Sequence, residues 1–163
     1  MTAQTVSYDA IKGATTSVFM LCASVEQELS KACLALGQAS PPQGMGALTQ
    51  AWLDLHVGRG GAEHTEILDR IDQRLREAIV LRNHLAHGIL GWSAAPHGPP
   101  EAAVIHTCLN GVERRFSWPD LLQAMLRLDR LRDAIPTMTH ALLKPERAAD
   151  AYQGLRINSL PDL

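Results

Sequence analysis

The residues of this sequence with the clearest capacity for chemistry lie close together in the stretch 81–88, LRNHLAHG. Arg82 carries a guanidinium that stays protonated and binds phosphate or carboxylate oxygens. His87 carries an imidazole whose ordinary pKa, about 6.5, suits proton transfer near neutral pH. An arginine and a histidine that flank one phosphodiester can stabilise its charge and transfer a proton, so this pair is the first candidate for a catalytic site.

Arg82 stands at an unusual position for a charged side chain. At about 100° per residue it falls near the centre of the apolar face of its predicted helix. That face is defined by Ile71, Leu75 and Ala78. An arginine directed at a core needs an anionic or carbonyl partner, and two interpretations stay open. Either its head reaches a carboxylate on another helix, such as Glu26 or Glu28, or this end of the bundle is open or covered by a second copy and the head binds a phosphate.

The spacing of the neighbouring polar residues decides which of them can act together. Asn83 and His87 are four apart and share one face, at the edge of the apolar stripe. Arg82 and His87 are five apart and diverge on an ideal helix, but both can reach one small anion if the helix loosens in its last turn, which Gly88 favours. His84 lies at a more solvent-facing angle, and we predict a surface residue there, with contact to a phosphate or a base as the alternative.

His84 and His87 also form an H-x-x-H pair that a metal ion could use, with a third ligand from His97, His106 or Cys108. Metal-binding pairs on helices more often have a spacing of four, and no acidic residue or cysteine stands close to the pair in the sequence. We therefore predict no metal site and no cofactor.

Three further residues are weaker candidates for binding a substrate. Arg114 and Arg115, in a predicted hairpin, can contact phosphates, although exposed charges on a hairpin usually serve solvation. Trp92 can stack on a base, although packing in a core or an interface explains a tryptophan more simply. Alternating charges at 127–133 predict a salt-bridged outer face of the last long helix.

The helices that must position these residues are predicted from apolar residues that recur three or four apart. The pattern predicts helices over 8–36, 47–56, 63–88 and 117–135. Ser117 is a natural N-cap for the last of these, with Asp120 as the acid of a capping box. Pro136 should kink or end that helix, and the chain after Lys144 looks weakly structured.

A small β segment is predicted between the third helix and the last. Residues 89–93 favour a short strand, and two β-prone runs within 103–116 flank Asn110-Gly111, a pair that favours a type I′ turn. The predicted fold is therefore mainly α: an antiparallel up-down bundle of four to five helices with a small β-hairpin inserted before the last long helix.

The composition is that of one globular domain over residues 1–163, with a core at about 5–143. Hydrophobic residues make up 46% and charged residues 20%, which is neither disordered nor membrane-like. The formal net charge of −2 shows no global attraction to nucleic acid, so phosphate binding must come from a local cluster. Three cysteines without a CxxC pair favour reduced thiols, and no secretion signal or membrane span is seen, so we expect a cytoplasmic protein.

The residues Arg82-Asn83, followed after three positions by His87, reproduce the R-N-x-x-x-H motif of the HEPN superfamily, whose helical domains are often tied to nucleotides and RNA. The setting is similar too, because the motif ends a helix of a bundle, a glycine follows, and an insert precedes another long helix. As architecture the resemblance covers about 5–143, whereas as sequence it covers the motif alone.

This resemblance implies a metal-independent endoribonuclease that acts as a homodimer. Two chains pair so that both motifs line one cleft, and the RNA 2′-hydroxyl attacks the neighbouring phosphorus to leave a 2′,3′-cyclic phosphate. By the same resemblance His87 is the general acid or base, Arg82 stabilises charge on the phosphate oxygens, and Asn83 orients the histidine or the phosphate. A toxin or phage-defence effector, held in check by a cognate antitoxin protein, is the implied role.

Two other hypotheses stay open, because many members of the superfamily are non-catalytic. In one, the chain is a silent helical module that binds a nucleotide or a protein, and Arg82 is structural. In the other, the motif only holds helices together within a dimer. The near-neutral charge and the lack of a basic groove favour a silent module, whereas Arg82 on an apolar face together with His87 favours the ribonuclease. A carboxylate that neutralises Arg82 in the core would argue against catalysis.

Overall fold

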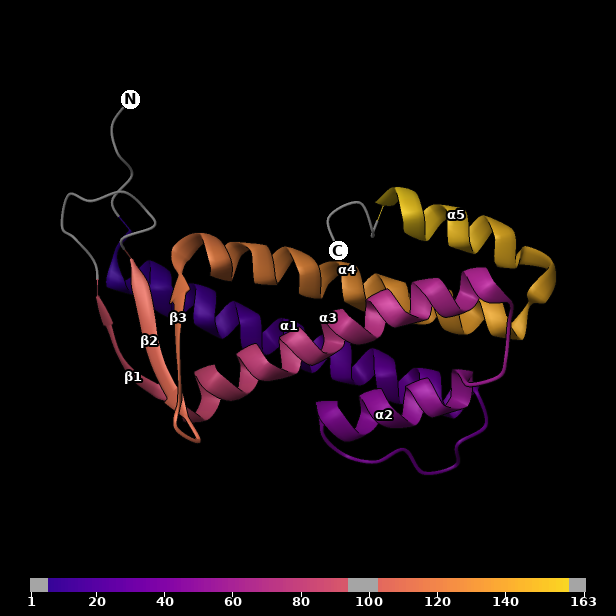
Figure 1. Ribbon diagram of the computed structural model, residues 1–163, viewed down its shortest axis with the longest axis horizontal. Coiled ribbons are helices and arrows are strands. Elements are labelled where there is room, and N and C mark those ends of the chain that lie inside the picture. Colours follow the sequence, from indigo (N-terminus) through magenta and orange to yellow (C-terminus); the bar gives the residue numbers. More distant parts are fainter. Residues whose placement is uncertain (1–5, 94–102, 159–163) are drawn as a thin grey trace.

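The computed structural model describes residues 6–93 and 103–158, which form a mainly α fold with a small antiparallel sheet, as predicted (Figure 1). The helices are α1 (Tyr8–Ala35), α2 (Met45–His56), α3 (Ala62–His87), α4 (Trp118–Leu143) and α5 (Ala148–Asn158), with a 3-10 turn, η2, at Pro145–Arg147. The sheet has the order β1 (Ile89–Ser93), β2 (Val104–Leu109), β3 (Val112–Ser117). No helix in this part of the chain combines the length and apolar character that crossing a bilayer requires.

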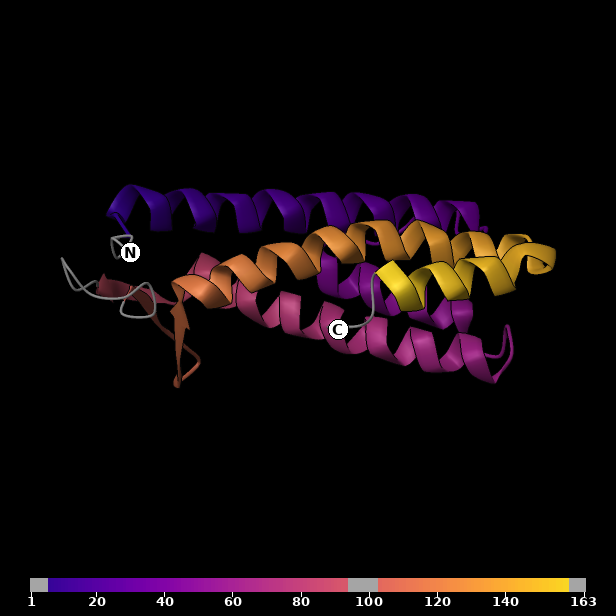
Figure 2. The same ribbon diagram turned by 90° about the horizontal axis from the view of Figure 1, so that it is seen from above.

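The long helices α1, α3 and α4 lie lengthwise, with the sheet at the end of the molecule where α1 and α4 begin and α3 ends (Figures 1 and 2). Successive helices alternate in direction from α2 to α5. By contrast, α1 and α2 run in the same direction because the loop 36–44 returns along α1 (Figure 1), so the strict up-down order that we predicted is not seen there. The short α2 lies along the C-terminal half of α1 and the N-terminal half of α3, and it leaves the end of α3 that carries the motif uncovered.

The core lies chiefly between α1 and α4, which form the most extensive contact between elements. The apolar stripe predicted for the first helix is buried, including Cys22 and Cys33. From α2, Trp52 is fully buried and its indole N–H donates to Oγ1 of Thr139 on α4 at 3.1 Å. This bond satisfies the one polar atom that burial of a tryptophan side chain would otherwise leave without a partner.

The C-terminal part of the chain differs from the predictions in two places. We expected Pro136 to kink or end the last long helix, and the helix does not end there but continues to Leu143. Proline there removes one helical N–H donor, and its exposed position lets water hydrate the carbonyl left without that donor. The chain after Lys144 is not weakly structured either, because it forms α5 and buries Tyr152 and Leu155. The core therefore extends past the boundary at about 143.

The small sheet and its junction with α4 confirm the predictions made from turn and cap residues. Asn110 and Gly111 both have positive φ, 53° and 78°, as a type I′ turn requires. At the start of α4, Ser117 Oγ accepts from the Asp120 N–H at 3.3 Å, and Asp120 Oδ2 accepts from the Ser117 N–H at 2.8 Å. Both halves of the capping box are thus present, which fixes the direction in which α4 leaves β3.

Candidate functional site

The end of α3 holds the motif in a regular helical conformation. The Gly88 N–H donates to the His84 carbonyl at 2.9 Å, which continues the helical pattern to the last residue, and the Gly88 carbonyl accepts from the Cys108 N–H at 2.7 Å. A Cβ at Gly88 would lie 3.0 Å from both the Cys108 and the His84 carbonyl oxygens, so glycine allows β2 to approach the helix end closely. The last turn therefore does not loosen, contrary to our expectation.

Arg82 is half-buried, and Asn83 is its hydrogen-bond partner. Nη1 of Arg82 donates to Oδ1 of Asn83 at 3.2 Å. Within residues 6–93 and 103–158, Arg82 forms no ion pair with a carboxylate, and Glu28, one of the two expected partners, pairs instead with Lys31 at 2.7 Å. The interpretation in which a carboxylate neutralises the guanidinium is therefore not supported by this structure.

The thiol of Cys22 shows where Arg82 lies relative to α1. Burial raises the pKa of Cys22 to about 11; the positive charge of Arg82 opposes this rise, and the negative charge of Glu26 adds to it. Arg82 and Glu26 are thus both close to Cys22 without being paired to each other. The guanidinium is therefore close enough to α1 to act on the charge of the Cys22 thiolate, and burial keeps this thiol neutral at physiological pH.

His87 is exposed and does not meet Arg82 within one chain. On a regular helix the two side chains are separated by about 140°, and Asn83 lies between them, about 40° from His87. The structure therefore brings Arg82 and Asn83 together and leaves His87 on the solvent side of the same helix end. One phosphate can contact both an Arg82 and a His87 side chain only if one of the two comes from a second copy of the chain.

His84 is not the surface residue that we predicted, because β2 and β3 cover this side of α3. Its side chain is 4% exposed, and its Nδ1 lies 2.9 Å from Thr107 Oγ1. The Thr107 hydroxyl donates to the Arg114 carbonyl at 3.3 Å, so Nδ1 of His84 must carry the proton that joins the two side chains. The ring also meets Phe116 edge-on at a centroid distance of 6.0 Å. His84 thus holds α3 against the sheet and is not available to a substrate.

The H-x-x-H pair is likewise not arranged to share a metal ion. His84 is buried and bonded to Thr107, whereas His87 is exposed on another side of the helix. Of the third ligands considered, His106 has its Nε2 3.0 Å from Ser93 Oγ, and His97 lies outside the described residues.

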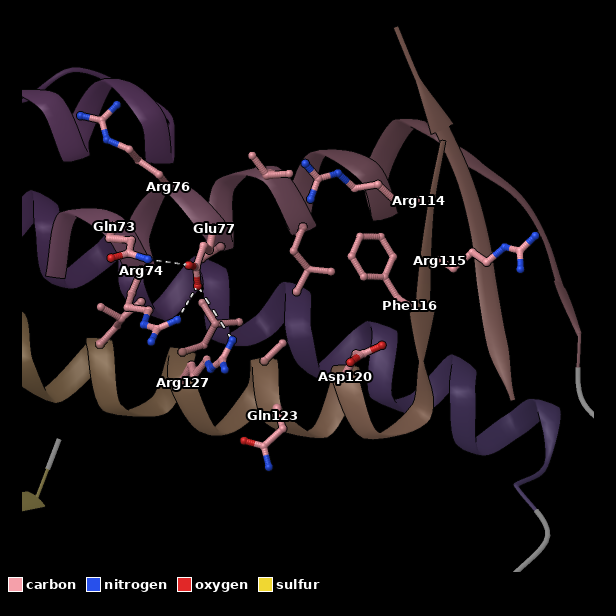
Figure 3. Close-up of a pocket in the computed structure, with 16 residues that line it drawn as sticks. Gln73, Arg74, Arg76, Glu77, Arg114, Arg115, Phe116, Asp120, Gln123 and Arg127 are labelled. Atoms are coloured by element: carbon pink, nitrogen blue, oxygen red, sulfur yellow. Dashed lines mark hydrogen bonds and ion pairs between the residues drawn. The ribbon is translucent and has the colours of Figure 1, made fainter. Parts of the chain in front are cut away.

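The three weaker candidates all lie at the surface of the sheet. Trp92 is 45% exposed and stacks on Tyr8 of α1, with ring centroids 4.8 Å apart, so it is not a core residue. Arg114 and Arg115 are exposed on β3. Figure 3 shows that Arg114 extends over a groove between α3 and α4, whereas Arg115 points away from it.

That groove is a feature that the sequence did not predict. It has a volume of about 670 Å³ and lies between α3, α4 and β3 (Figure 3). Its lining includes the arginines Arg74, Arg76, Arg114, Arg115 and Arg127. Our expectation that the chain lacks a basic groove is therefore wrong. The alternating charges of the last helix predicted only part of the arrangement. Arg132 does pair with Asp129 and Asp133 as expected, but Arg127 turns toward Glu77 of α3 at 3.8 Å.

A second feature missed from the sequence is a buried chain of polar rings that joins α2, α3 and α5. His56 Nδ1 lies 2.9 Å from His64 Nε2, and His64 Nδ1 lies 2.8 Å from the Tyr152 hydroxyl. Burial, the neighbouring His64 and the charge of Arg59 lower the pKa of His56 to about 3, and burial also lowers the pKa of His64. Both rings are therefore neutral near pH 7 and tie the ends of three helices together.

Comparison with known proteins does not assign the chain to a family: no family model matches it, and no curated protein or solved structure gives a significant match.

Proposed function

We propose that the chain is a metal-independent endoribonuclease of the HEPN type that acts as a homodimer in the cytoplasm. The proposal rests on the R-N-x-x-x-H motif and on one observation: the half-buried guanidinium of Arg82 is oriented by Asn83 and has no carboxylate partner in the described part of the chain. A positive charge held in this way is available to a phosphate oxygen. RNA is the proposed substrate, and a toxin or phage-defence effector inhibited by an antitoxin protein is the proposed role.

The proposed reaction assigns one task to each residue of the motif. The RNA 2′-hydroxyl attacks the adjacent phosphorus, the 5′-oxygen leaves, and a 2′,3′-cyclic phosphate remains. His87 accepts the proton of the 2′-hydroxyl or donates one to the departing oxygen. Arg82 binds the phosphate oxygens while negative charge accumulates on them, and Asn83 holds the guanidinium in place.

Pairing of two chains accounts for the divergence of Arg82 and His87 on one helix. On α1, Phe19, Ala23 and Glu26 share a face because they are three or four residues apart; Ala23 is exposed, and Phe19 and Glu26 are half-buried. Beside them Met20 is 68% exposed. The exposed apolar side chains of Met20 and Ala23 favour a face of α1 that is covered by another chain. In such a pair Arg82 of one copy and His87 of the other can reach the same phosphate.

The test is cleavage of total RNA in the presence of EDTA. Wild type should cleave and leave cyclic phosphate ends, whereas Arg82→Ala should lose about two to three orders of magnitude in rate, and His87→Ala should be similarly impaired. The matched controls Arg70→Ala and His140→Ala change an exposed arginine of α3 and an exposed histidine of α4, and they should cleave as wild type does. If neither wild type nor any variant cleaves RNA, the result would favour the non-catalytic module that binds a nucleotide or a protein.

A mixing experiment tests the shared site. If Arg82 and His87 act across two chains, mixed dimers of Arg82→Ala and His87→Ala contain one intact site, and activity should reappear when the two inactive proteins are combined and allowed to exchange subunits. A site built within one chain stays inactive in every such mixture, so the absence of recovery in dimers that demonstrably exchange would refute pairing across chains.

A further inference from the structure

None of the motif residues Arg82, Asn83 and His87 lines the groove between α3, α4 and β3, and we propose that this groove binds an acidic amphipathic helix of a partner protein. The proposal goes beyond the proposed ribonuclease and does not depend on it. The groove runs along α3 from Gln73 to Leu81 and along α4 from Asp120 to Leu131, about 12 Å and 16 Å of helix axis. That length accommodates two to three turns of a docked helix.

The floor of the groove is apolar. It is formed by Ala78, Leu81, Phe116, Ala124, Leu128 and Leu131. Ala78 and Ala124 are small residues on the facing helices, which keeps the centre of the floor open to a side chain from outside. Apolar residues of a docked helix at positions i, i+3 or i+4, and i+7 face one side and fit a floor of this kind.

The rim of the groove is positive. Glu77 is shared by Arg74 at 2.8 Å and Arg127 at 3.8 Å, so one carboxylate faces two guanidinium groups (Figure 3). Asp120 is engaged in the cap of α4. Arg114 has no ion pair with any described residue and extends over the groove beside Phe116 (Figure 3). The rim therefore attracts a ligand that carries carboxylates.

The same seam already holds one helix of this chain. The helix α5 packs on α4 and touches α3, where Arg156 lies 3.4 Å from Glu63 and 3.5 Å from Glu66. Figure 2 shows α5 over one end of the seam between α3 and α4, and no other described helix lies over the remainder. Glu63, Glu66, Arg70, Arg74 and Glu77 recur three or four apart along one face of α3. At the N-terminal end of this face, Glu63 and Glu66 bind Arg156 of α5. The part that α5 does not cover is rich in arginine and therefore favours a ligand with acidic residues.

A helix fits this groove better than a nucleic-acid strand does. Strands of RNA bind to successive aromatic rings along a positive track, and Phe116 is the one aromatic side chain of the lining. Phe116 is also half-buried and packs against His84, which leaves little of its face for stacking. Glu77 and Asp120 would further repel phosphates, whereas a helix can place its acidic residues opposite the arginines alone.

The experiment uses a fluorescein-labelled synthetic peptide of about four turns with leucines at helical spacing and glutamates elsewhere, and a second peptide with lysines in place of the glutamates. Binding to the full chain is measured by fluorescence anisotropy. The acidic peptide should bind more tightly than the basic one, and Arg114→Glu should weaken its binding about five- to tenfold. Arg147→Glu changes an exposed arginine of η2 that does not line the groove; it is the matched control and should have a much smaller effect.

A second variant tests the floor. Ala124→Gln places a longer neutral side chain in the groove and should weaken the acidic peptide at least tenfold, whereas Ala149→Gln on the exposed side of α5 should not, and thermal unfolding confirms that both variants fold. Equal binding of both peptides, or binding insensitive to Arg114→Glu and Ala124→Gln, overturns the proposal. The proposal is also overturned if a single-stranded RNA binds, is weakened by Arg114→Glu and Ala124→Gln, and the acidic peptide does not bind. If the chain dimerises and Ala124→Gln abolishes the dimer, the groove is instead a binding site for a second copy of the chain.

Discussion

Acidification should destabilise this protein through the buried pair His56 and His64. Their rings are 1% exposed and stack with centroids 5.1 Å apart, and Nε2 of His56 has no hydrogen-bond partner among the described residues. A proton added to His56 would therefore be a charge removed from water and placed beside a second imidazole. This is why the folded protein holds the pKa of His56 at about 3.

The size and sign of the effect follow from the difference between folded and unfolded protein. Well above pH 6.5 both histidines are neutral in the folded and the unfolded protein, so they contribute nothing to the pH dependence there. As pH falls through about 6.5, the unfolded chain binds protons that the folded chain does not bind. The free energy of unfolding therefore decreases by about 1.4 kcal/mol per pH unit for His56. Between pH 6.5 and 4.5 the loss from His56 alone is about 2 kcal/mol, and the lowered pKa of His64 adds to it in the same direction.

The assay is urea unfolding followed by far-ultraviolet circular dichroism at several pH values between 4.5 and 7. Carboxyl groups begin to titrate at the lower end of this window, so the difference between wild type and a variant of His56 isolates the contribution of that histidine. His56→Gln cannot take up a proton and should lose about 2 kcal/mol less stability across the window than wild type does. The matched control His140→Gln changes an exposed histidine of α4 and should follow wild type.

Two results would refute this reasoning. If wild type and His56→Gln lose the same free energy of unfolding between pH 6.5 and 4.5, the buried pair does not exclude protons. If His140→Gln flattens the pH dependence as much as His56→Gln, the slope comes from histidines in general and not from burial. Stability at pH 7 does not decide the matter, because His56→Gln also breaks the bond to His64 and should be less stable than wild type there.

Three other substitutions test the contacts of the buried histidines His84 and His64, all by urea unfolding at pH 7. His84→Ala should cost about 2–4 kcal/mol, and Thr107→Val about 1–3 kcal/mol, because each leaves its buried partner without a hydrogen bond; a double variant that costs as much as the sum would show that the two do not interact. Gly60→Ala should cost about 1–2 kcal/mol, because Gly60 has φ +88° and a Cβ there would lie 2.7 Å from the His64 ring; a neutral effect would mean that the loop before α3 rearranges freely.

The elements that position the motif could be predicted because their signals are local. The helix that carries Arg82 was predicted from the spacing of its own apolar residues, and the hairpin from Asn110-Gly111. The cap at Ser117 depends on a residue only three positions away. Interactions of this range are nearly the same in any fold, so the sequence suffices to predict them. The helix α5 was missed because its stability comes from packing on α4 and from the distant His64, not from its own pattern.

Of the candidate site, too, one part could be predicted from the sequence and another part could not. The sequence by itself determined that Arg82, Asn83 and His87 occur at the end of an amphipathic helix, with the arginine at an apolar angle, because helical periodicity is a property of the chain. Only the tertiary structure decided that the sheet covers His84 and that Arg82 forms no ion pair with a carboxylate of the described residues. The physical reason is that burial and pairing depend on which elements pack together and at what angle. Contacts between residues that lie far apart in the chain decide that angle, and no local pattern contains it.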